Sequence, residues 1–215
     1  MNQKYLDDTR RSYDKVAKKY VEHIYDELKD KPLDRELLDR FADELKDKGL
    51  VCDVGCGPGQ VARYLFERGV NVCGVDLSQG MIDEARVLNP EIKFTQGNMM
   101  SLDFEDKAFA GITAFYSLIH IPREDLVTAL VELKRVLKAN GLLFMAFHIG
   151  VEIMHVEELW EEKINADFIF FQTDEMRNYL TDAGFEVVEA IEREPYKDVE
   201  HQSRRSYIFA RKPTQ

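Results

Sequence analysis

A glycine-rich segment between an apolar run and an amphipathic run is the feature that most constrains this fold. The apolar run VCDV (51–54) is followed by GCGPG (55–59) and then by QVARYLFERG (60–69), whose spacing predicts a helix. Three glycines and a proline suit neither a strand nor a helix interior. The segment therefore predicts a tight turn from a strand into a helix. In open parallel sheets such a turn offers free backbone N–H groups to a nucleotide-like ligand.

Short apolar runs alternate with helical patterns along the middle of the chain. We expect strands at 50–54, 70–76, 92–97, 109–116 and 142–149, and helices at 60–69, 78–89 and 123–141. This alternation predicts an α/β fold: a doubly wound, Rossmann-like three-layer sandwich built on a mostly parallel sheet.

The two ends of the chain differ from this pattern. Two helices, over 3–29 and from Pro32 to Gly49, are expected before the first strand. A helix over 173–185 is followed by two apolar runs, 186–194 and 204–212, with no helix between them. Strands joined without a crossover pair antiparallel. We therefore expect a seven-stranded sheet that starts parallel and finishes with an antiparallel edge, with the last strand antiparallel.

Composition narrows the class of protein. Lys and Arg total 29 against 40 Asp and Glu, which gives a net charge of −11 and argues against a broad nucleic-acid footprint. The chain has no apolar run of about 20 residues that could span a bilayer, and its first residues lack an apolar signal core. Three cysteines at irregular spacing predict buried, reduced thiols. We expect a cytoplasmic protein without a membrane partner.

Asp76 adds to the argument from the glycine turn. It ends the second expected strand, 21 residues after Gly55, where an acid accepts hydrogen bonds from ribose hydroxyls. The dinucleotide fingerprint G-x-G-x-x-G is not kept, because Gln60 replaces its last glycine and Pro58 intrudes. The turn thus suits a nucleotide-like ligand but departs from the dinucleotide pattern.

The order of motifs resembles the class I S-adenosylmethionine (SAM) dependent methyltransferases. The sequence D-V-G-C-G-P-G (53–59) is similar to motif I of that family. The segments similar to its later motifs follow in the family's order: GVDLSQGMIDEA (74–85), FTQGNMMSLDF (94–104), FAGITAFYSLIHI (109–121) and LKRVLKANGLLFMAFH (133–148). Asn98 stands where the family usually has Asp, and an amide oxygen can still accept a bond from adenine.

The resemblance implies SAM as cofactor, S-adenosylhomocysteine as product and a small-molecule acceptor. Asp53 would orient the turn or meet the ligand amine, Asp76 would bind the ribose, and Tyr116 would lie near the sulfonium. The cofactor-binding residues that the resemblance implies are Asp53, Gly55, Cys56, Gly57, Asp76, Leu77, Met81, Asn98, Met99, Tyr116 and Tyr20.

The resemblance also divides the chain. We expect one methyltransferase domain over 1–215, with covering helices at 1–48 and a SAM-binding core at 49–149. An aromatic-rich cap insertion is expected at 150–172, and the last helix and antiparallel strands at 173–215. The oligomeric state is left open.

Methyl transfer needs few catalytic groups, because the methyl of a sulfonium is already activated and alignment with the acceptor does much of the work. A base is needed only when the acceptor loses a proton. His120 is the best candidate for that base, with Tyr116 as the second catalytic candidate, and a purely structural histidine is the alternative for His120.

Two other groups of residues could bind a metal ion or an anion. His148, Glu152 and His155 have helical spacing that could gather a metal, but Gly150 interrupts it and no metal is predicted. Arg204 and Arg205 could bind an anionic substrate, although charges on an edge strand are usually solvated.

The sequence predicts a SAM-dependent methyltransferase acting on a small molecule. A SAM-binding protein without transferase activity stays open as an alternative. An NAD-dependent oxidoreductase is disfavoured by Gln60 and by the antiparallel end of the sheet.

Overall fold

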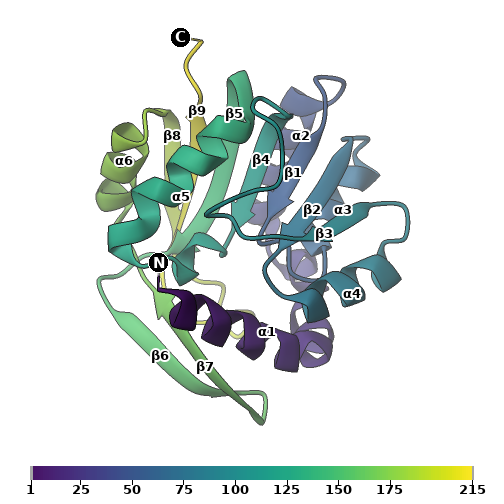
Figure 1. The fold of residues 1–215 in the computed structure, drawn as a ribbon, viewed down its shortest axis with the longest axis vertical. Coiled ribbons are helices and arrows are strands. Elements are labelled where there is room, and N and C mark those ends of the chain that lie inside the picture. Colours follow the sequence, from purple (N-terminus) through teal and green to yellow (C-terminus); the bar gives the residue numbers. More distant parts are fainter. Residues whose placement is uncertain (1, 215) are drawn as a thin grey trace.

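The computed structural model describes residues 2–214, and the strands expected from the sequence join one sheet (Figure 1). The helices are α1 Gln3–Ile24, α2 Pro32–Leu45, α3 Gln60–Glu67, α4 Gln79–Leu88, α5 Arg123–Val136 and α6 Thr173–Asp182, with 3-10 turns η1 Glu27–Asp30 and η2 Leu118–His120. The strands are β1 Val51–Val54, β2 Val72–Asp76, β3 Lys93–Gln96, β4 Phe109–Phe115, β5 Leu137–His148, β6 Ile153–Leu159, β7 Glu162–Ile169, β8 Glu186–Arg193 and β9 Arg205–Arg211.

The sheet has seven strands in the order β3-β2-β1-β4-β5-β9-β8. The strands from β3 to β5 pair parallel, and β9 is antiparallel to both β5 and β8. The Rossmann-like fold and the reversed last strand are thus confirmed. This end of the sheet consists of the antiparallel pair β9 and β8, with β8 outermost. The order reverses between β1 and β4, which is where ligands bind in open α/β sheets.

Two apolar cores cover the two faces of the sheet. One contains buried residues of α5 and α6, among them Leu133 and Met176, packed on strands β1, β4 and β5. The other contains residues of α2, α3 and α4, among them Phe41 and Leu65. Strand β1 is buried along its whole length. Burial on both faces explains why β2 and β4 are nearly continuous apolar runs rather than alternating ones.

Two expected helix boundaries differ from the structure. Helix α5 ends at Val136, not at 141, because Leu137 is extended, fully buried and paired with Phe109 of β4. Helix α1 ends at Ile24, and the separate turn η1 leads to Pro32, which begins α2.

The aromatic-rich insertion forms an antiparallel hairpin of β6 and β7. Figure 1 shows α1 lying between this hairpin and α4. Ser12 Oγ accepts a 2.8 Å bond from Asn165 N in β7, and Asp14 Oδ1 accepts a 2.7 Å bond from Ser78 Oγ at the start of α4. These bonds hold α1 against both neighbours. Among the helices of residues 2–214, none combines the length and the apolar character that crossing a membrane requires.

Candidate functional site

Two glycines of the turn differ in their surroundings: Gly55 is tightly packed, whereas Gly57 has free space beside it. A Cβ on Gly55 would lie 2.2 Å from Ser117 Cβ, so the turn packs directly on the segment after β4. Gly57 has a φ of +52°, and the nearest atoms to a Cβ there lie 3.8 Å away, in Gln60 and Tyr20. Packing therefore leaves space beside Gly57, where a ligand can approach the backbone.

Asp76 joins the turn to the end of β2. Its Oδ2 accepts a 2.8 Å bond from Gly57 N, and its Oδ1 accepts a 2.8 Å bond from Ser78 N. Burial raises the pKa of Asp76 to about 6, and these N–H groups oppose the rise. The carboxylate is thus held at the mouth of the turn by two backbone donors.

Asp53, near the end of β1, and Cys56, within the turn, are both buried, and neither lines a cavity described below. Asp53 is 1% exposed, and its Oδ1 accepts a 2.8 Å bond from Thr113 Oγ1. Its Oδ2 has no hydrogen-bond partner within residues 2–214. Burial raises the pKa of Asp53 to about 7. This position favours support of the turn over contact with a ligand amine.

The other predicted site residues meet around one space, the glycine-turn cavity, of about 90 Å³. They are Gly55, Gly57, Asp76, Leu77, Met81, Asn98, Met99, Tyr116, His120 and Tyr20. Helix α1 roofs this cavity with Leu6, Thr9, Arg10 and Tyr13, which the sequence reasoning did not assign to the site. The apolar stripe of α1 predicted its buried face, and the resemblance implied that the N-terminal helices cover the core, but of α1 only Tyr20 was assigned to the site.

A second space, the hairpin cavity, has a volume of about 510 Å³. Its apolar wall comes from the hairpin, with Met154, Val156, Leu159, Trp160, Phe168 and Phe170. Its polar wall includes Lys31, His148, Glu200, His201 and Arg205. Tyr13, Tyr20 and Tyr116 line both cavities, so the two spaces share a wall of three tyrosines.

Tyr116 follows β4 in a strained conformation. Its φ is +49°, which is uncommon for an aromatic residue and costs on the order of 1–3 kcal/mol. Lys31 Nζ and the Arg205 guanidinium each lie 5.6 Å from its ring centroid. Burial raises the pKa of the Tyr116 hydroxyl above its usual value. The ring is therefore fixed where the two cavities meet.

His120, in η2, contacts two other elements. Its Nε2 lies 2.7 Å from the Tyr13 hydroxyl in α1, and its Nδ1 lies 2.8 Å from the carbonyl oxygen of Asp167 in β7. Burial lowers the pKa of His120 to about 4, so the ring is neutral at physiological pH.

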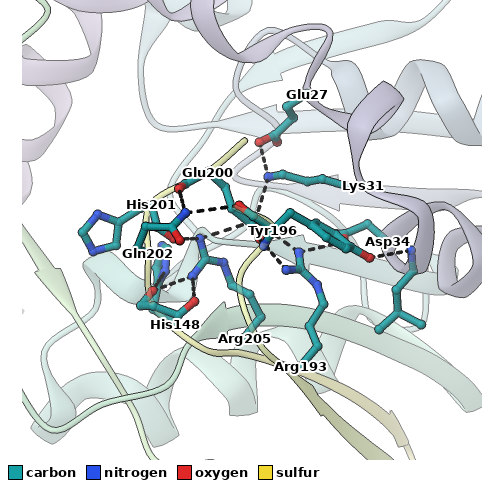
Figure 2. A network of polar contacts seen from close by, with 12 residues as sticks. Glu27, Lys31, Asp34, His148, Arg193, Tyr196, Glu200, His201, Gln202 and Arg205 are labelled. Carbon is teal, nitrogen blue, oxygen red and sulfur yellow. Dashed lines mark hydrogen bonds and ion pairs between the residues drawn. The ribbon is translucent and has the colours of Figure 1, made fainter. Parts of the chain in front are cut away.

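A buried ionic network forms the polar wall of the hairpin cavity (Figure 2). Glu200 pairs with Lys31 at 3.5 Å, with Arg205 at 3.4 Å and also with Arg193. Arg193 pairs in turn with buried Asp34 at 3.0 Å. Burial alone would raise the pKa of Glu200, but hydrogen bonds from Arg193 and Tyr196 and the nearby cations lower it to about 2. The network ties the segment after α1 to the β8–β9 loop.

This network corrects the expectation for Arg205. Its side chain is 2% exposed and donates a 2.7 Å bond to the carbonyl oxygen of His201. The neighbouring Arg204 is half-exposed and pairs with Glu192 and Glu194, as expected of a solvated charge. The alternation of the strand turns one arginine outward and the other inward.

The three residues weighed as metal ligands do not converge. His148 Nδ1 lies 2.9 Å from Ser203 Oγ, and His155 Nδ1 lies 2.7 Å from Asp167 Oδ1. Glu152 accepts a bond from the backbone of Val151. Within residues 2–214 no group of three or more His, Cys, Asp or Glu side chains could hold a metal ion.

Comparison with known proteins finds a methyltransferase-domain match over part of the chain and solved structures with the same fold. Residues 51–141 match the family model described as a methyltransferase domain. The chain is 28% identical over 152 residues to the sterol 24-C-methyltransferase ERG6B of Gibberella zeae, a match that covers 64% of this chain and 40% of that protein. The chain thus spans about two fifths of the length of this curated relative.

Two solved structures share the fold. A SAM-dependent methyltransferase of Methanosarcina mazei has a TM-score of 0.72 and 18% identity, covering 80% of this chain and 97% of that one. The [4+2]-cyclase SpnF has a TM-score of 0.64 and 22% identity, covering 82% of each chain. The open backbone at Gly57 and the carboxylate of Asp76 beside it fit a nucleoside cofactor. Together these matches support a class I SAM-dependent methyltransferase, with S-adenosylmethionine as the cofactor.

Proposed function

We propose that this protein transfers the methyl group of SAM to a small-molecule acceptor by in-line displacement. The observation that carries the proposal is the shared wall of Tyr13, Tyr20 and Tyr116 between the glycine-turn cavity and the hairpin cavity. Methyl transfer requires a donor and an acceptor held in adjoining sites with their reacting atoms aligned. Two cavities that meet at one wall provide that arrangement.

In this proposal the donor occupies the glycine-turn cavity. Asp76 binds the ribose hydroxyls, Asn98 and Met99 flank the adenine, and the methionine part lies along Gly55 and Gly57. Leu77 and Met81 add apolar contacts to the adenine end, and Tyr20 covers the cofactor from α1. Tyr116 lies beside the sulfonium, and Asp53 and Cys56 support the turn from below. When bound, SAM supplies the activated methyl group, and these residues hold it in place.

Donor binding also requires α1 to shift. The glycine-turn cavity measures about 90 Å³, well below the roughly 300–1,000 Å³ of typical ligand sites. Its roof consists of side chains from α1, which is held by side-chain hydrogen bonds to α4 and to the hairpin. We therefore infer that α1 moves outward when SAM enters and closes again over it.

The acceptor occupies the hairpin cavity, and the volume and the lining residues of that cavity indicate its chemical class. The volume of about 510 Å³ suits a small molecule, and the hairpin side is apolar and aromatic. The similarity to a sterol 24-C-methyltransferase favours an acceptor with an apolar body. The net charge of −11 disfavours nucleic acid as the acceptor. A cytoplasmic location and the division of the chain into one domain stay predictions.

One alternative is favoured by a specific observation. The [4+2]-cyclase that shares the fold is not named as a methyltransferase, so the fold alone does not establish methyl transfer. A SAM-binding protein without transferase activity would have the same glycine-turn cavity.

Formation of S-adenosylhomocysteine separates the two functions. Purified protein is incubated with tritium-labelled SAM and a fractionated extract of small metabolites. A transferase releases S-adenosylhomocysteine in proportion to labelled product, and only with particular fractions. Protein that binds SAM but forms no S-adenosylhomocysteine with any fraction would support the alternative.

A further inference from the structure

Three elements meet at one hydrogen-bonded chain of Tyr13, His120 and the carbonyl of Asp167. A carbonyl oxygen can only accept, so Nδ1 of His120 carries the proton and donates it to Asp167 over 2.8 Å. In the neutral ring Nε2 is then an acceptor, and the Tyr13 hydroxyl donates to it over 2.7 Å. The contact thereby assigns both the tautomer of His120 and the direction of the bond.

The hydrogen-bonded residues Tyr13 and His120 can take up a proton from a bound acceptor. Burial lowers the pKa of His120 to about 4 and raises the pKa of Tyr13, so both groups are neutral at rest. The one basic lone pair of His120 faces the Tyr13 hydroxyl. A proton that reaches the oxygen of Tyr13 can therefore be passed on as Tyr13 gives its own proton to Nε2.

Tyr13 connects its hydrogen bond with His120 to both cavities. Tyr13 lines the glycine-turn cavity and the hairpin cavity, whereas His120 lines only the former. An acceptor in the hairpin cavity can thus reach His120 through Tyr13. Because Tyr13 lies on α1, closure of that helix also brings the Tyr13 hydroxyl to His120.

We propose that Tyr13 and His120 form a proton relay that serves methyl transfer to a hydroxyl group on an apolar acceptor. The proposal rests on the function proposed above. A lone pair of the acceptor oxygen forms the new bond to the methyl carbon, and the S–CH₃ bond breaks with its electrons left on sulfur. The acceptor O–H bond then breaks. Its proton moves to the Tyr13 oxygen while the Tyr13 proton moves to Nε2, leaving a neutral ether and a His120 imidazolium that later releases its proton to solvent.

The weak basicity of the pair selects the acceptor class. A hydroxyl oxygen that has gained a methyl group is a strong acid, so even a weak base removes its proton. An alkylammonium, with a pKa of about 10, would keep its proton in the presence of His120. A carboxylate or thiolate carries no proton to remove. The apolar hairpin wall, including Trp160 and Phe168, suits the body of an alcohol or phenol.

The acceptor class is tested with four probes that share one ring system: naphthol, naphthylmethanol, naphthylmethylamine and naphthoic acid. Each is incubated with the protein and tritium-labelled SAM, and SAM binding is measured in parallel. Label in the hydroxyl probes alone supports the proposal. Label only in the amine or the acid overturns it, as does SAM binding without transfer to either hydroxyl probe. Failure to bind SAM would instead contradict the proposed cofactor site.

The relay is tested with Tyr13→Phe, which keeps the ring and removes the hydroxyl. We expect turnover of the hydroxyl probe to fall about 100-fold or more at saturating SAM, with SAM affinity unchanged. Tyr25→Phe is the matched control, because it removes a 2.7 Å hydroxyl bond between the end of α1 and Asn89 but lines neither cavity. Weaker SAM binding with unchanged turnover would show that Tyr13 only holds α1 closed and would overturn the relay.

The tautomer of His120 is a test that needs no acceptor. Nitrogen-15 NMR of histidine-labelled protein should show a neutral His120 ring protonated at Nδ1, with Nε2 accepting a hydrogen bond that Tyr13→Phe removes. A ring protonated at Nε2 would overturn the relay.

Discussion

The glycine-turn cavity and the hairpin cavity adjoin, yet they are built in different ways. The floor of the first comes from short segments at the ends of neighbouring strands, namely 54–60, 75–81, 97–99 and 115–121. The second is assembled from α1, the hairpin and the β8–β9 loop, which are far apart in the sequence. The topology of the sheet fixes the first cavity, while packing among additions to the sheet fixes the second.

The two cavities also handle buried charge differently. Beside the glycine turn, the buried carboxylate of Asp53 and the partly buried carboxylate of Asp76 accept hydrogen bonds from neutral donors only, and the pKa of each is raised. In the hairpin cavity, Glu200 is surrounded by Lys31, Arg193 and Arg205, and its pKa is lowered. The first arrangement costs stability at neutral pH, whereas the second depends on complete pairing.

Arg205→Met should produce the largest effect on stability. The substitution removes the buried ion pair between Arg205 and Glu200 and leaves Glu200 with less compensating charge. Removing one partner of a buried pair costs about 3–5 kcal/mol. The neighbouring Arg204→Met is the control, since its exposed ion pairs are worth about 0–1 kcal/mol. Urea unfolding measures both. Equal losses in the two variants would contradict the view that this wall depends on buried pairing.

Asp53→Asn should show a pH-dependent difference from the wild type. The folded-state pKa of Asp53 is raised to about 7 from 3.8, so its contribution is most favourable below pH 4 and is lost as pH rises to about 7. The unfolding free energy of the wild type relative to the variant should fall across this window by up to about 4 kcal/mol. A difference that is constant from pH 4 to pH 8 would mean that the carboxyl group is not desolvated under the turn.

Alanine substitutions at two glycines should separate packing from openness within the turn. Gly55→Ala and Gly57→Ala share a positive φ, but only the former drives a Cβ into Ser117. Overpacking of this kind costs about 1–3 kcal/mol, so Gly55→Ala should be less stable than Gly57→Ala by that amount in thermal or urea unfolding. Equal stability of the two variants would show that Ser117 yields to the turn.

The contrast between a cavity built from strand ends and a cavity built from distant segments also explains what the sequence could predict. The glycine turn and Asp76 are local signals, because the strand, the turn and the acid at the end of β2 lie close together in the chain. Their common cavity followed from the rule that the carboxyl ends of parallel strands meet. The end of α5 was mispredicted because the helical spacing continues past Val136, and only pairing of Leu137 with Phe109 ends it.

The hairpin and the ionic network lacked such local signals. In β6 the apolar residues Ile153, Met154, Val156 and Leu159 follow neither strict alternation nor a clear helical period, and a bulge interrupts the pairing near Glu158. Arg205 pairs with Glu200, and Glu200 also pairs with Lys31, which lies more than 170 residues from Arg205 in the sequence. Long-range pairing of this kind leaves no trace in one sequence.

Titration calorimetry of SAM, S-adenosylhomocysteine and NAD, with the wild type and Asp76→Ala, tests the central claim most directly. The claim is that the glycine turn and Asp76 form the SAM site. We predict roughly micromolar binding of SAM and S-adenosylhomocysteine and none of NAD. Loss of charged hydrogen bonds to the ribose should weaken SAM binding at least about tenfold in the variant. Binding of NAD, no binding of SAM, or wild-type SAM affinity in a folded Asp76→Ala protein would contradict the account.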